Sequence, residues 1–130
     1  MPVSKQILDG IKSSEVVVAI DGERHLWDWS GHKQGGVVDE GEELWLFSRH
    51  GALREDCRYS VAEVERRLEQ GGKRPLPATH TIDGVDEGAV AVRGSSRAAA
   101  MKLAHKLRLT LFFGLSQGGM VAVFTGREGE

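Results

Sequence analysis

The chain of 130 residues has little cysteine and no long apolar run. Its single cysteine, Cys57, excludes an intramolecular disulfide framework and indicates a reducing compartment. The first residues lack the charged and then apolar layout of a signal peptide, and no apolar run reaches the roughly 20 residues of a membrane span. We therefore expect a cytoplasmic protein without a membrane-spanning segment.

Histidine is missing from the region where the one catalytic signature would require it. Residues 111–121 contain the pattern G-x-S-x-G, with Ser116 as its serine. The segment resembles the nucleophile elbow of the α/β-hydrolase family, which implies a hydrolase that uses Ser116. In that family the acid and the histidine follow the serine in the chain. All five histidines here precede Ser116: His25, His32, His50, His80 and His105.

The same segment also fits a β-hairpin. Apolar runs over residues 109–113 and 120–124 flank the glycines, which is typical of two strands joined by a tight turn. A serine is a poor nucleophile unless a histidine takes its proton. We therefore favour the hairpin, and the hydrolase remains an alternative.

Apolar spacing and capping residues predict three helices. A capping box formed by Ser60 and Glu63 begins one of them, which ends at the glycine pair 71–72. Ser95 or Ser96 caps another, which has one apolar stripe. The predicted helices are residues 3–12, a helix that runs from Val61 to the Gly71-Gly72 pair, and residues 96–108.

Residues 15–47 predict an antiparallel meander. The Asp21-Gly22 pair is a two-residue turn between strands at 15–20 and 25–29. Residues 43–47 return as the third main strand.

The rest of the chain predicts two more hairpins. Residues 79–82 and 89–92 form one of them, after an extended connection that contains Pro75 and Pro77. Residues 109–125 form the closing hairpin. Together these elements predict one compact α+β domain over the whole chain, with about three helices packed on a mostly antiparallel sheet.

The net charge of −2 hides a segregation of charge along the chain. From residue 89 to residue 127 there are six basic residues and no acidic one. A basic helix is able to bind phosphates or nucleic acid, although a pI near 6.2 is far from that of a dedicated nucleic-acid binder. The candidate anion-binding residues are Arg93, Arg97, Lys102, Lys106 and Arg108.

The first part of the chain admits the opposite kind of partner. Eleven of the nineteen acidic residues lie before residue 57. Some crowd a Gly-rich loop, where they could attract a basic protein surface by charge complementarity. These candidate protein-binding residues are Asp39, Glu40, Glu42 and Glu43.

Tryptophans lie on two of the predicted strands. Strand alternation places Trp27 and Trp29 on one face, and Trp45 lies on the third strand. If these faces coincide, they form either a core under a helix or a stacking platform for bases or sugars, and we favour the core. His25, Asp28 and His32 have no standard metal-site spacing, so neither a metal nor a cofactor is predicted.

The sequence thus favours a small non-enzymatic binding protein, an adaptor, inhibitor or regulator, that acts on a protein partner through charged surfaces. A nucleic-acid-binding module that uses helix 96–108 is the first alternative, and a hydrolase that uses Ser116 is the second. A homodimer formed through the edge of the last hairpin is also open.

Overall fold

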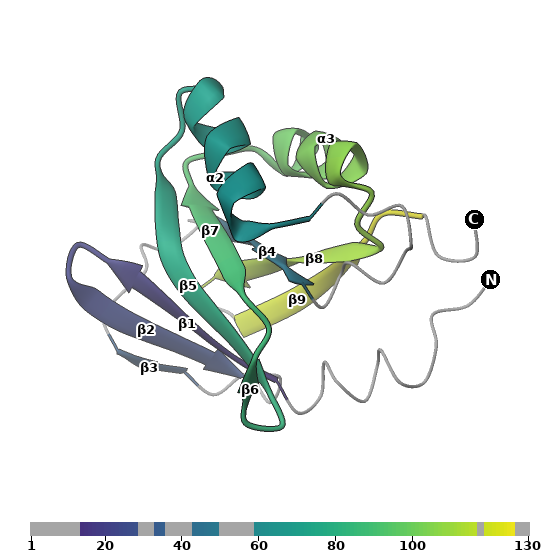
Figure 1. The fold of residues 1–130 in the computed structure, drawn as a ribbon. Coiled ribbons are helices and arrows are strands. Elements are labelled where there is room, and N and C mark those ends of the chain that lie inside the picture. Colours follow the sequence, from purple (N-terminus) through teal and green to yellow (C-terminus); the bar gives the residue numbers. More distant parts are fainter. Residues whose placement is uncertain (1–13, 29–32, 36–42, 50–58, 117–118, 127–130) are drawn as a thin grey trace.

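A computed structural model describes residues 14–28, 33–35, 43–49, 59–116 and 119–126. In this part of the chain nine antiparallel strands form one curled sheet, and two helices cover one of its faces (Figure 1). The strands are β1 Ser14–Ile20, β2 Glu23–Asp28, β3 Lys33–Gly35, β4 Glu43–Ser48, β5 Pro75–Ile82, β6 Val85–Asp86, β7 Ala89–Arg93, β8 Leu111–Ser116 and β9 Gly119–Phe124. Their spatial order is β3-β2-β1-β5-β7-β4-β8-β9, and β6 pairs with β5.

The two helices are α2 Val61–Gln70 and α3 Arg97–Leu107. Both helices were predicted and are confirmed: Ser60 caps the first as expected, and of the two candidates Ser95 and Ser96 it is Ser96 that caps the second. The predicted helix at 3–12 lies outside the described residues. Neither described helix is long and apolar enough to cross a membrane.

The predicted fold class, about three helices packed on a sheet, is wrong. The described part of the chain is mainly a half-barrel of strands, and both of its helices lie on the same face (Figure 1). The physical reason is that strands predicted as separate hairpins join into one continuous sheet. In a curled sheet the strands at the two ends approach each other and shield the concave face from water. Helices are then required only on the convex face.

The curl originates at β5, which changes partner halfway along. Residues 75–78 pair with β7, and residues 78–82 pair with β1, so that Ala78 belongs to both pairings. Pro75 and Pro77 lie in the first half, where β5 has a strand on one side only. A proline lacks the N–H that a second neighbouring strand would need, so it is tolerated there. The predicted extended connection is therefore the first half of a strand.

The concave face holds one apolar core. Its members come from both ends of the sheet, for example Val16 from β1, Phe113 from β8 and Met120 from β9. Trp27 on β2 joins this core, and its Nε1 donates a hydrogen bond of 2.9 Å to the carbonyl of Ser116. This bond connects two strands that are five places apart in the sheet order, so it closes the curl.

The convex face holds a second core under the helices. Trp45 and Phe47 of β4 pack there with Val64 and Leu68 of α2 and with Phe112 of β8. Trp27 and Trp45 are both buried, as favoured from the sequence, but they lie on opposite faces of the sheet. The shared aromatic platform is therefore not formed by these two residues, and Trp29 lies outside the described residues.

Two predicted pairings need correction. β4 is not the third strand of a meander with β1 and β2, because it pairs with β7 and β8 instead. Residues 89–92 pair with 75–78, not with 79–82. The turn at Asp21-Gly22 is confirmed, with φ of 51° and 84°. β9 ends the sheet order, and the homodimer through its edge stays a prediction.

Gly114 lies where the sheet has no room for a side chain. A Cβ at this position would lie 3.0 Å from Glu43 Oε2, 3.1 Å from Trp45 Cζ3 and 3.2 Å from Val121 Cγ2. Glu43 and Val121 are exposed and able to move, but the Trp45 ring is buried. The glycine of the G-x-S-x-G pattern therefore has a packing role here.

We expect Gly114→Ala to lower the free energy of unfolding by about 1–3 kcal/mol, because the added methyl group overpacks the sheet against Trp45. Urea denaturation measures the effect. Gly71→Ala is the matched control, since a Cβ there meets no atom closer than 3.5 Å and its φ of −84° suits alanine. Equal stability of the two variants would contradict the packing role.

Candidate functional site

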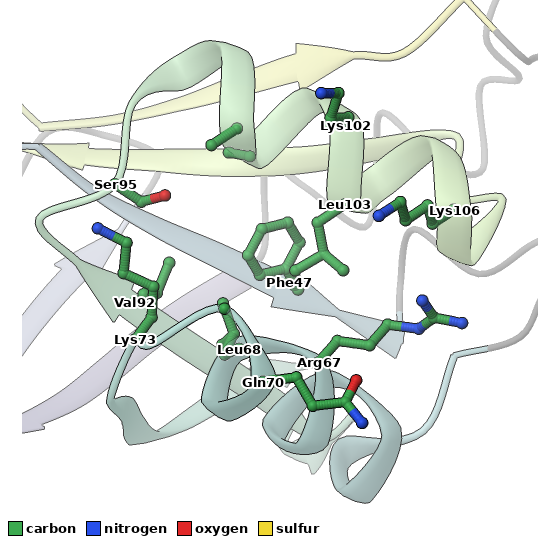
Figure 2. A pocket seen from close by; sticks show the side chains of 13 residues that line it. Phe47, Arg67, Leu68, Gln70, Lys73, Val92, Ser95, Lys102, Leu103 and Lys106 are labelled. Atoms are coloured by element: carbon green, nitrogen blue, oxygen red, sulfur yellow. The ribbon is translucent and has the colours of Figure 1, made fainter.

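A groove of about 390 Å³ lies between α2 and α3 on the convex face of the sheet (Figure 2). α2 packs against β5 and β7, whereas α3 packs against β4. Each helix thus rests on its own part of the sheet, and the groove is the space between them. Among the described residues that line it, none is acidic.

Hydrogen bonds fix the start of α2. Ser60 Oγ accepts a bond of 3.1 Å from the backbone N–H of Glu63, and this caps the helix. The Tyr59 hydroxyl donates to the carbonyls of Phe47 and Gly88, at 2.9 Å and 3.0 Å. The helix is therefore tied to β4 and to the residue that precedes β7.

The start of α3 is tied to the sheet in the same manner. Trp45 Nε1 donates a bond of 2.7 Å to the carbonyl of Ser95, and Ser96 Oγ caps the helix at the N–H of Ala99, 3.1 Å away. The buried side chains of α3 are Ala100, Ala104 and Leu107. On the side of the groove this helix presents Ala99, Ala100, Lys102, Leu103 and Lys106.

The floor of the groove is apolar. Phe47 and Val92 come from the sheet, Leu68 comes from α2, and Ala100 and Leu103 come from α3. Leu103 is partly exposed and points toward Phe47 (Figure 2). An apolar side chain of a ligand would gain by leaving water for this floor.

Four cationic side chains surround the floor: Arg67, Lys73, Lys102 and Lys106. Lys73 Nζ donates a bond of 2.9 Å to the carbonyl of Gly94. Within the described part of the chain no acidic side chain pairs with Lys102 or Lys106, and both are exposed. These two ammonium groups are therefore available to a ligand.

Glu63 is an acidic residue in direct contact with one of these cations, Arg67. Its carboxylate accepts hydrogen bonds from Arg66 Nη2 at 2.7 Å and from Arg67 Nε at 2.8 Å. The bonds from Arg66, with a further contribution from Arg67, keep the pKa of the Glu63 carboxyl below its usual value. Glu63 therefore remains ionised at neutral pH and offsets part of the charge of Arg67.

The predicted anion-binding residues divide into two groups. Lys102 and Lys106 line the groove together. Arg93 lies 3.9 Å from the carboxylate of Asp21, and Arg97 is exposed at the start of α3. Arg108 ends α3 with a φ of 59°. These three are not among the residues that line the groove.

Arg67 and Lys73 were not predicted as site residues. The signal was present, because the pairs Arg66-Arg67 and Lys73-Arg74 flank the glycines that end α2. Helix phase decides which arginine faces the groove. Arg67 follows Val64 by three residues and precedes Leu68, both of which are buried.

The acidic candidates are not brought together in the described structure. Glu43 begins β4 and is exposed, with its Oε2 near Gly114. Asp39, Glu40 and Glu42 lie outside the described residues. A basic partner for this group stays a prediction.

Ser116 lies in a hairpin, as favoured from the sequence. β8 and β9 pair antiparallel and Ser116 is opposite Gly119. In a nucleophile elbow a helix follows the serine, whereas here the chain returns as strand β9. The backbone carbonyl of Ser116 has a structural role as the acceptor for Trp27.

The described histidines of the sheet are buried. His80 Nδ1 lies 2.5 Å from Ser48 Oγ, and its ring packs edge-on against Phe113 at a centroid distance of 5.0 Å. His25 stacks on Trp27. Among described residues no group of three histidine, cysteine or acidic side chains is placed to bind a metal ion, and His32 lies outside them.

Comparisons of this chain with protein-family models, with curated proteins and with solved structures gave no match.

A larger apolar side chain placed in the groove tests whether the groove is open and apolar. We expect Ala99→Leu to raise the free energy of unfolding by about 1 kcal/mol, because Ala99 lines the groove and the larger side chain buries more apolar area there. Urea denaturation measures this. Ala98→Leu is the control, since Ala98 is exposed on the same turn but does not line the groove. A gain of the same size in both variants would contradict the expectation.

Proposed function

We propose that this protein is a non-enzymatic binding protein whose α2–α3 groove receives an acidic segment of a protein partner. The observation that supports the proposal most directly is the combination of an apolar floor with four cationic side chains around it. Apolar contact supplies affinity in such a site, and charge complementarity supplies orientation and specificity.

The groove favours a protein segment over a nucleic acid. Binding of single-stranded nucleic acid draws much of its affinity from bases that stack on exposed aromatic rings. The described tryptophans, Trp27 and Trp45, are each 1% exposed, and Phe47 is buried at the bottom of the groove. The accessible part of the floor is aliphatic, which suits a leucine-like side chain better than a base.

The lysines of the rim provide the first test. A short fluorescent peptide of alternating glutamate and leucine is titrated with the protein, and anisotropy reports binding. We expect saturable binding that weakens with added salt and that falls about threefold to tenfold in the Lys102→Gln/Lys106→Gln double variant, as expected for the loss of two exposed ion pairs.

Two controls complete this test. Arg97→Gln should bind like the unchanged protein, because Arg97 lies on the same helix but does not line the groove. A lysine–leucine peptide of the same length should not bind. The proposal is wrong if the acidic peptide does not bind, or if a labelled oligonucleotide binds more tightly and with the same dependence on Lys102 and Lys106.

Glu63 should act as a competitor for the ligand. We expect Glu63→Gln to raise the affinity for the acidic peptide about twofold to fivefold, because it leaves Arg67 without its exposed ionic partner. The same titration measures this. Glu65→Gln is the control, since it also removes one negative charge from α2. Equal gains in the two variants would show a general effect of net charge and contradict the competition.

A further inference from the structure

Three of the four cations around the groove lie toward its two ends (Figure 2). In Figure 2, Lys73 and Ser95 lie toward one end, Arg67 and Lys106 lie toward the other, and Phe47 and Leu103 lie between them. The bond from Lys73 to the carbonyl of Gly94 independently places this lysine beside the start of α3. Lys106 lies in the last turn of the same helix. The groove thus has a cationic end, an apolar middle and a second cationic end.

The length of α3 sets the distance between the two ends. From Ser96 to Lys106 the helix advances by ten residues, which is about 15 Å at the α-helical rise. An extended peptide advances about 3.3 Å per residue, so four steps cover about 13 Å. The flexible lysine side chains make up the small difference. Two acidic residues that are four positions apart in an extended segment therefore match the two ends.

The alternation of side chains in an extended segment defines the middle position. Residues i, i+2 and i+4 point to the same side, whereas i+1 and i+3 point away. With acidic residues at i and i+4, the residue at i+2 faces Phe47 and Leu103. A leucine-sized aliphatic side chain fits there, because the groove of about 390 Å³ has an apolar floor and no acidic lining residue in the described chain.

We infer that the groove recognises an extended protein segment of the form acidic-x-aliphatic-x-acidic. The inference rests on the proposed function and specifies the partner of that same site. It also assigns different roles to the cations: Lys73 binds one terminal acid of the motif, and Arg67 and Lys106 bind the other.

Peptides of identical composition test the spacing. Glu-Ser-Leu-Ser-Glu, flanked by glycines and labelled, is compared with Glu-Leu-Ser-Ser-Glu, in which the leucine points away from the floor. We expect the first to bind at least about tenfold more tightly, which is the effect of burying one leucine side chain. A third peptide without leucine, Glu-Ser-Ser-Ser-Glu, should also bind at least about tenfold more weakly than the first. Because charge is equal in all three peptides, a general basic surface would bind them alike.

Variants then test the two ends. Lys73→Gln and Lys106→Gln should each weaken binding of Glu-Ser-Leu-Ser-Glu by about twofold to fivefold. Each loss should disappear when the glutamate at the corresponding end of the peptide is replaced by glutamine, and the two variants should respond to opposite ends. Heteronuclear NMR spectra of the same samples establish that the variants are folded.

The outcomes separate this inference from the proposed function. Binding of all acidic peptides regardless of the position of leucine overturns the motif and leaves an acidic partner in place. Binding of none of them, together with no binding of the alternating glutamate–leucine peptide, overturns both. Preference for the Glu-Ser-Leu-Ser-Glu order, with the two variants coupled to opposite ends, supports the motif.

Discussion

The structure depends on the burial of its central strands on both faces. The residues of β4, β7 and β8 are buried at nearly every position, so both faces of the sheet must be shielded from water. The curl shields the concave face, where the change of partner along β5 brings β2 toward β8 and Trp27 reaches Ser116. The convex face is left to two short helices. Both cores, and the placement of the helices, follow from this requirement.

The groove is a consequence of how the convex face is covered. α2 and α3 have ten and eleven residues, and each is positioned by its own hydrogen bonds to the sheet. The part of α3 that lines the groove carries Ala99 and Ala100 together with Leu103 and two lysines, and the space between the helices stays open. Polar side chains at a helix surface normally point to water. Here long cationic chains stand beside an apolar strip, which leaves room for a ligand that has both an apolar and an anionic part.

Local features of the fold were predictable from the sequence, but its long-range pairing was not. Ser60, Ser96 and the Asp21-Gly22 turn act over a few residues, so their consequences were read correctly. The position of β4 in the sheet depends on its pairing with β7 and β8, which are distant in the sequence. The unbroken apolar run of residues 44–47 is typical of a strand buried on both faces, but it does not say which strands lie beside it. Two of the four cations of the groove were predictable for the same reason. Lys102 and Lys106 lie on one helix, where sequence spacing alone brings them together, whereas only the fold brings Arg67 and Lys73 beside them.

The net charge of the chain says little about this site. Charges more than about 8 Å apart in solvent are largely screened at physiological salt, so a ligand in the groove responds to the four cations around it rather than to the total of −2. Among the described residues, Glu63 pairs with one of these four cations, Arg67. If an acidic segment binds as proposed, the local charge of the groove orients it even though the chain as a whole is negative.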